Sequence, residues 1–261
     1  MLRWGRVLLG AMPLLPEAAA QRLLRRWHPF DLRHGTDTGG LLYAPDLPTG
    51  HSNDAFNEGY YATAPSVFRT LIARWKDTLQ PAGLRVSDYS FVDLGCGKGR
   101  ALLLASEFGF RSITGIELNP GLCAAAEQNV RHWRRRRRAC PPISVVCGDV
   151  LESPLQAPSS PDRPLVLFLF NSFSAEVVRG LLARLTGVGH DTAGQTGKAG
   201  PSARARSAPI DLLYVHPDQA AIVERTPGVE LLADMVIRFS AEDAAADAFG
   251  VDVDRCAVYR M

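Results

Sequence analysis

A glycine-rich turn carries the residues whose types and spacing point most directly to chemistry. Segment 91–100 reads Phe-Val-Asp-Leu-Gly-Cys-Gly-Lys-Gly-Arg, with Asp93 two residues before the first of three alternating glycines. An apolar run precedes the turn, and a helical apolar pattern follows it. A strand, a glycine turn and a helix in succession let backbone approach a ligand closely at a helix N-terminus. The candidate ligand-binding residues of this turn are Asp93, Gly95, Cys96, Gly97 and Gly99.

The spacing of the glycines narrows the class of ligand. A turn that binds a dinucleotide has the pattern G-x-G-x-x-G, whereas this turn runs G-x-G-x-G. A turn that binds phosphates ends in a Lys-Ser or Lys-Thr pair, whereas Lys98 is followed by Gly99. The turn therefore favours a nucleoside ligand without phosphate. NAD stays open as the alternative, because Glu117, about 20 residues downstream, could accept both ribose hydroxyl protons in either class.

The acid-plus-glycine turn resembles motif I of the class I S-adenosylmethionine (SAM) methyltransferases. That resemblance implies that SAM is the cofactor and that the glycines lie against its methionine and ribose parts. It also implies that Glu117 binds the ribose and that Asp149, after the next strand, accepts a hydrogen bond from the adenine amino group. Three segments are together similar to bacterial methyltransferase-domain proteins of unassigned substrate. These segments are residues 34–39, 60–65 and 93–100.

The resemblance places the methyl acceptor near residues 169–173, which read Leu-Phe-Asn-Ser-Phe. This segment is similar to the Asn-Pro-Phe type of motif of some amino-methylating enzymes, although Ser172 replaces the proline. We expect Asn171 to contact the cofactor and to orient an amine or hydroxyl acceptor, with a plain loop as the alternative. Asp37 is the second candidate catalytic residue, because its turn-rich loop over residues 30–40 concentrates acids, threonines and a histidine.

An aromatic segment before a predicted helix could fold over the ligand. Residues 60–65 read Tyr-Tyr-Ala-Thr-Ala-Pro, and Tyr61 and Thr63 are candidate cofactor contacts. Simple packing of the two tyrosines explains the segment equally well. Apolar residues at helical spacing predict the helix itself over residues 66–79, with Ser66 as its N-cap.

Alternating strands and helices predict the fold that positions these residues. After the strand that leads into the glycine turn, helices are predicted over 100–108, 120–136 and 174–185, and strands over 112–117, 143–147, 165–170 and 211–215. Repeated β-α units imply a parallel sheet with right-handed crossovers. Short strands over 235–239 and 256–259 could pair antiparallel at the C-terminal edge. With the resemblance, this predicts an α/β fold: a doubly wound, mostly parallel, seven-stranded Rossmann-like methyltransferase sheet with an N-terminal helical and loop extension.

Length and composition suggest the domain organisation. The 261 residues suit an extension over 1–84, with a helix and a cofactor-covering loop, followed by a methyltransferase domain over 85–261. Residues 187–209 are rich in Gly, Ala, Ser, Thr and Arg, which predicts a disordered insertion. Residues 1–21 have some features of a signal peptide, but interrupting prolines and returning arginines favour a short amphipathic helix.

Cysteine usage and charge bear on location and partners. The five cysteines are scattered and odd in number, which argues against a disulfide framework and a zinc site, so no metal is expected. No apolar run is long enough to cross a membrane, and we expect a cytoplasmic protein. The net charge of +2 is too small to argue for nucleic acid. The arginine run over 134–138 is either a solvated helix end or a basic patch for an acidic partner.

Three functions remain open at this point. The first is a SAM-dependent methyltransferase with a nitrogen or oxygen acceptor, which could be a protein, a nucleic acid or a small molecule. The second is an oxidoreductase that binds NAD(P). The third is a protein that keeps a methyltransferase fold only as a binding module.

Overall fold

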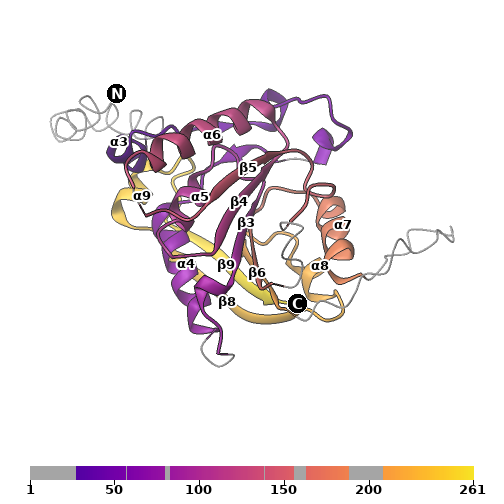
Figure 1. Ribbon diagram of the computed structural model, residues 1–261. Helices are drawn as coiled ribbons and strands as arrows, with labels where there is room; N and C mark the ends of the chain where they lie inside the picture. The colour runs from indigo at the N-terminus through magenta and orange to yellow at the C-terminus, as the bar shows by residue number, and fades with distance from the viewer. Residues whose placement is uncertain (1–27, 57, 80–82, 138, 156–162, 188–207) are drawn as a thin grey trace.

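A seven-stranded sheet forms the centre of the protein. In the computed structural model, which describes residues 28–56, 58–79, 83–137, 139–155, 163–187 and 208–261, the strand order is β5-β4-β3-β6-β7-β9-β8 (Figure 1). The strands are β3 (Ser90–Leu94), β4 (Ser112–Glu117), β5 (Ile143–Cys147), β6 (Leu165–Phe170), β7 (Ile210–Val215), β8 (Glu230–Arg238) and β9 (Val253–Arg260). The first five in this order run parallel, and β9 pairs antiparallel with both β7 and β8. The predicted fold class is confirmed.

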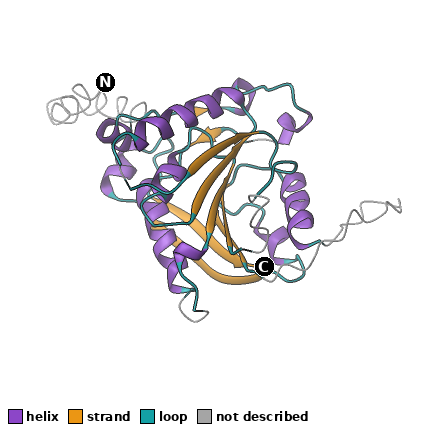
Figure 2. Cartoon of the chain, in the orientation of Figure 1, coloured by secondary structure: helices purple, strands orange, loops and turns teal. Residues whose placement is uncertain are grey.

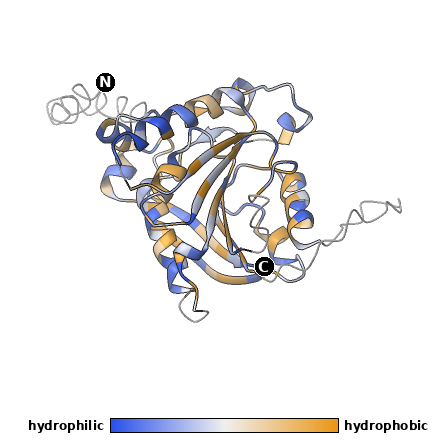
Figure 3. Cartoon of the chain, in the orientation of Figure 1, coloured by the Kyte–Doolittle hydropathy of each residue, from blue (hydrophilic) through white to orange (hydrophobic). Residues whose placement is uncertain are grey.

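Helices cover both faces of the sheet (Figure 2). One face carries α4 (Pro65–Asp77), α5 (Arg100–Ala105) and α6 (Pro120–Arg134), and the other carries α7 (Ala175–Thr186) and α8 (Ala220–Glu224). The short helices α3 (Pro29–His34) and α9 (Ala241–Ala246) contact one another beside the first group. Because both faces are covered, the inner strands are largely apolar, as the orange segments of the strands in Figure 3 show, and β6 is apolar along its whole length.

Local sequence explains where the main helices begin and end. Asn119 caps α6, because its side-chain oxygen accepts hydrogen bonds from the amides of Gly121 and Leu122. Pro120 follows at the first helical position, where its missing N–H costs nothing. Helix α7 ends at Gly187, whose φ of +70° is the left-handed conformation that glycine adopts readily.

The segment over residues 28–64, called here the N-terminal strap, crosses the carboxyl end of the sheet. It contains α3, the paired short strands β1 (Leu41–Leu42) and β2 (Tyr60–Tyr61), and the 3-10 turns η2 (Ala44–Asp46) and η3 (Ser52–Phe56). A further 3-10 turn, η5 (Val86–Asp88), precedes β3. Within the described part of the chain, no helix is both long and apolar enough to cross a membrane.

Several local predictions need correction. Residues 30–40 are not wholly irregular, because α3 forms there, with the imidazole of His28 accepting a hydrogen bond from the Phe30 amide. Ser66 is not an N-cap: α4 begins one residue earlier, and the Ser66 amide donates to Asp243 instead. Helices α8 and α9 were not predicted, because both are too short to show helical periodicity. The predicted helix over residues 1–21 and nearly all of the predicted insertion lie outside the described residues.

Candidate active site

The glycine turn after β3 adopts a conformation that only glycine accommodates easily. Gly95, Gly97 and Gly99 have φ angles of +76°, +52° and +84°. A Cβ atom on Gly97 would lie 2.1 Å from Cε2 of Tyr60, and one on Gly95 would lie 2.8 Å from Cβ of Ser172. The alternating glycines therefore allow two other segments of the chain to close over the turn.

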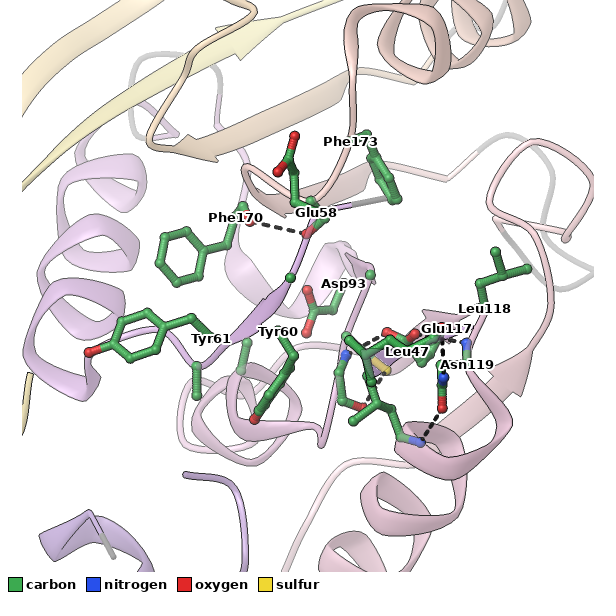
Figure 4. Close-up of a pocket in the computed structure, with 18 of the residues that line it drawn as sticks. Leu47, Glu58, Tyr60, Tyr61, Asp93, Glu117, Leu118, Asn119, Phe170 and Phe173 are labelled. Carbon is green, nitrogen blue, oxygen red and sulfur yellow. Dashed lines mark hydrogen bonds between the residues drawn. The ribbon is translucent and has the colours of Figure 1, made fainter. Parts of the chain in front are cut away.

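A cleft of about 840 Å³, part of it open to solvent, lies over this turn (Figure 4). The N-terminal strap supplies one wall, and the ends of β3, β4 and β6 supply the others. The predicted site residues that line it are Tyr61, Thr63, Asp93, Gly95, Cys96, Gly97 and Glu117. The structure thus brings together, around one cleft, residues that are far apart in the sequence.

Asp93 is a buried acid without a hydrogen-bonding partner among the described residues. It is 4% exposed, it lines the cleft, and no described residue donates a hydrogen bond to its carboxylate. Burial, with the nearby charge of Glu117 as a second cause, raises the pKa of Asp93 well above its ordinary value. A ligand that brought a positive charge or a hydrogen-bond donor to this carboxylate would therefore lower the free-energy cost of burying it.

Glu117, at the end of β4, is held in one orientation by backbone amides. One carboxylate oxygen accepts a hydrogen bond from Gly97 at 2.8 Å, and the other accepts one from Asn119 at 2.9 Å. Burial raises its pKa, although these bonds oppose the shift. Each carboxylate oxygen can accept more than one hydrogen bond, so Glu117 can still bind a pair of hydroxyl groups in the cleft.

Asp149 borders a smaller adjoining cavity of about 290 Å³. Gly95, Leu118 and Phe173 line both spaces, so the cavity extends the cleft along the sheet edge. Asp149 accepts hydrogen bonds from the amide of Leu151 and from the side chain of Asn53, which belongs to the strap. The strap therefore already supplies an amide donor to the carboxylate that was predicted to bind an adenine amino group.

The two predicted catalytic residues do not line the cleft. Asn171 donates a hydrogen bond to Asp218 at 2.7 Å, and its neighbours Phe170 and Ser172 line the cleft in its place. The side chain of Asp37 is 66% exposed and lies 3.3 Å from Nζ of Lys98. Gly99 is also absent from the lining; it packs α5 close to α6 instead.

A buried ion pair that the sequence did not reveal fixes the strap to the glycine turn. Arg100, directly after the turn, lies with its Nη2 atom 3.2 Å from a carboxylate oxygen of Asp31. Thr36 and Thr38 also donate to Asp31, and Arg100 donates to the Thr38 hydroxyl at 2.8 Å. The only signal in the sequence was an arginine at the start of an otherwise apolar helix, since such a residue needs an acidic partner when buried.

Parts of the arginine run also contact the protein. Arg136 donates to the carbonyl of His34 at 2.8 Å, and the guanidinium of Arg137 lies 3.9 Å from the ring centre of Trp133. Arg134 and Arg135 are exposed, and residue 138 lies outside the description. Within the described residues, all five cysteines are free, and no three metal-ligating side chains cluster.

Part of the chain is similar to known proteins. Residues 91–189 match a family model described as a methyltransferase domain. Among solved structures, precorrin-6y C5,15-methyltransferase from Geobacter metallireducens GS-15 is 16% identical, with 71% of this chain and 85% of that chain covered and a TM-score of 0.42. Magnesium protoporphyrin IX methyltransferase from Synechocystis PCC 6803, solved with bound SAM, is 11% identical, with 75% and 79% covered and a TM-score of 0.45. No curated protein matches the chain.

The assignment rests on the family-model match together with the fold, because the likenesses to solved structures are weak. The matched residues begin in β3 and include the glycine turn, Glu117 and Asp149. They also include the segment that follows β6. The chain therefore contains a methyltransferase domain over residues 91–189.

Proposed function

We propose that the cleft over the glycine turn binds SAM and that the chain transfers its methyl group to a nitrogen or oxygen acceptor. The unpartnered, buried carboxylate of Asp93 carries this proposal, because it needs a positively charged or donor group from a ligand. The methionine part of SAM has an ammonium group that meets this need. The turn also lacks the third-glycine spacing and the Lys-Ser pair of dinucleotide and phosphate sites, which argues against NAD(P).

Each lining residue then has a role that its geometry supports. Asp93 would bind the ammonium group, and Glu117, oriented by the two amides, would accept the ribose hydroxyl protons. Asp149 would accept a hydrogen bond from the adenine amino group in addition to the one it accepts from Asn53. Backbone at Gly95, Cys96 and Gly97 would form the floor, with Tyr61 and Thr63 opposite.

SAM supplies a methyl group that is already activated on a sulfonium, so the protein mainly aligns the acceptor and excludes water. The strap covers the cleft from the side opposite the sheet, and the Arg100–Asp31 pair holds it there. In-line displacement needs a base only when the acceptor is protonated. Asn171 lies one residue beyond the cleft-lining Phe170 and would contact the acceptor, whereas Asp37 would act only through Lys98.

Isothermal titration of the full chain with SAM, S-adenosylhomocysteine and NADH tests the proposal. We expect both SAM and S-adenosylhomocysteine to bind with micromolar affinity and NADH not to bind. The variant Glu117→Gln should weaken SAM binding by about tenfold or more, which corresponds to about 1.4 kcal/mol. Glu127→Gln removes an exposed acid on α6 that pairs with Arg131, and it should leave the affinity unchanged.

A folded sample that binds NADH but not SAM would replace the proposal with the oxidoreductase. Binding of SAM without methyl transfer to any acceptor fraction of a lysate would favour a binding module.

A further inference from the structure

The ends of β6 and β7 carry two residues in unusual backbone conformations. Phe170 and Val215 are partners in the parallel register, so the residues that follow them, Asn171 and His216, leave the sheet side by side. Their φ angles are +37° and +49°, and they are the only non-glycine residues with positive φ in the described part of the chain. Such conformations persist only where the surroundings hold them, and they concentrate at functional sites.

His216 is part of a His-Asp pair. Its Nε2 atom lies 2.6 Å from a carboxylate oxygen of Asp254, whose side chain is buried, while the His216 side chain is 42% exposed. No described residue donates a well-aligned hydrogen bond to that carboxylate oxygen, so the close approach of His216 is the contact that can satisfy it. A neutral His216 ring with its proton on Nε2, facing Asp254, keeps its lone pair on Nδ1. No described residue bonds Nδ1, so it can accept a proton from a ligand.

A wall of aromatic rings connects His216 to the cleft. The His216 ring stacks on Phe170, with ring centres 5.5 Å apart and planes 19° apart. Phe170 lines the cleft, and so does Tyr61, whose ring centre lies 6.3 Å from that of Phe170. Phe249, which is 61% exposed, contacts the other side of Tyr61 at 5.2 Å. We call Tyr61, Phe170 and Phe249 the aromatic mouth.

The charged groups around the mouth are acidic. Asp254 on β9, Asp218 after β7 and Asp247 after α9 all raise the pKa of His216, with the Asp254 hydrogen bond as the largest cause and burial opposing it. Asp247 also accepts a hydrogen bond from the Tyr61 hydroxyl. Arg100 is the one basic side chain among the described residues that line the cleft, and Asp31 already neutralises it. Acidic and aromatic groups together attract an organic cation and repel an anion.

We propose that the methyl acceptor is an amine that arrives protonated at the aromatic mouth and that His216 removes its proton. This inference rests on the proposed function. Nδ1 of His216 takes one N–H proton from the ammonium group, and that proton later passes to solvent. The nitrogen lone pair then forms the new N–C bond while the C–S bond of the sulfonium breaks and its electron pair stays on sulfur. The product is a methylated ammonium and S-adenosylhomocysteine.

Label transfer from tritiated SAM tests this inference with the full chain. The amine pool contains phenethylamine, putrescine and a lysine-containing peptide, and the matched acid pool contains phenylpropionate, succinate and a glutamate-containing peptide. We expect label only in the amine pool, at a rate that falls as the pH drops below the pKa of His216. Glycine readily adopts the positive φ of residue 216, so the variant His216→Gly should still fold. The rate of methyl transfer should fall by about tenfold or more in this variant, and added imidazole should restore part of it. The SAM affinity of the variant should stay within about twofold of that of the wild type.

Asp252→Asn is the matched control, because Asp252 lies two residues from Asp254 but pairs with Arg238 on the surface. It should leave the rate unchanged. Label in the acid pool, equal rates for the wild type and His216→Gly, or no labelled pool from a protein that binds SAM would each overturn the inference. Failure to bind SAM at all would overturn the proposed function, and the inference with it.

Discussion

The two ends of the cleft are built in different ways. At the glycine-turn end, Asp93 and Glu117 are buried, and backbone amides or packed strands fix them. At the aromatic mouth, half-exposed side chains such as His216 and Phe249 leave the ends of strands and loops. This difference indicates that the strands and turns of the fold determine the shape of the glycine-turn end. The mouth depends on a few side chains, which can change without altering the sheet.

The largest predicted effect concerns the contact that closes the glycine-turn end. Arg100→Ala would leave Asp31 as a buried charge without its cation, and we expect unfolding free energy to fall by about 3–5 kcal/mol. Urea unfolding monitored by circular dichroism measures this change. Arg85→Ala breaks an exposed pair with Asp88 and should have no measurable effect. Equal losses in both variants would show that the strap is not held by this pair.

The same pair predicts a dependence on pH. Burial alone would raise the pKa of Asp31, but Arg100 and the bonds from Thr36 and Thr38 outweigh burial and hold it below its ordinary 3.8. The stability that ionised Asp31 contributes is therefore complete above pH 3.8 and is lost as the pH falls through the lower, folded-state pKa. We expect the stability difference between the wild type and Asp31→Asn to shrink below pH 3.8. A difference that grows on acidification would contradict the assignment.

A third prediction concerns the floor of the cleft at its glycine-turn end. Gly97→Ala combines a left-handed backbone with a Cβ atom 2.1 Å from Tyr60, so it should displace the strap and greatly weaken SAM binding. Gly109→Ala is the control, because Gly109 also has a positive φ of +75° but nothing lies within 4 Å. The control should lose only the backbone cost of about 1–3 kcal/mol and bind SAM normally. Calorimetry and thermal unfolding of both variants separate the two effects.

How much could be predicted from the sequence differs between the same two ends. Asp93, Gly95, Gly97 and Glu117 lie on strongly patterned strand-turn-helix units, so both their positions in the fold and their convergence on one cleft were predictable. The position of the strap was harder to predict, because its hydrogen bonds join residues such as Asp31 and Arg100 that are 69 positions apart in the sequence. No local pattern reports a contact of that range.

The mouth was the least predictable region. His216 directly follows a predicted strand, but its partner Asp254 lies on β9, and only the antiparallel pairing of β9 with β7 brings the two together. Asn171 was predicted from a motif, and the structure places its side chain on Asp218, outside the lining of the cleft. Side-chain direction after a strand depends on φ, and a positive φ at a residue other than glycine has no sequence signature.

A fourth prediction uses the free-energy cost of burying the carboxylate of Asp93. Because its folded-state pKa is raised, ionised Asp93 destabilises the ligand-free protein, and this penalty grows as the pH rises through that pKa. Asp93→Asn should therefore melt at a higher temperature than the wild type near neutral pH, and the difference should vanish in acid. A lower melting temperature for the variant would show that a protein group, not a ligand, satisfies Asp93.

The smallest predicted effect lies at the mouth. Asp254→Asn removes the bond that raises the pKa of His216, so that pKa should fall in the variant. In the wild type this pair contributes stability that is complete below the unfolded-state pKa of about 6.5 and is lost as the pH rises through the folded-state value. Titration of the His216 ring by NMR measures the shift directly. An unchanged pKa of His216 in the variant would contradict the proposed pairing of His216 with Asp254.

The most direct test of the account compares SAM affinity in one variant from each end. Calorimetric titration of Asp93→Asn should give a dissociation constant about tenfold or more above that of the wild type, because the variant loses the carboxylate that we propose binds the ammonium group. His216→Gly should stay within about twofold of the wild type. If instead His216→Gly loses SAM binding while Asp93→Asn keeps it, the cofactor does not lie on the glycine turn.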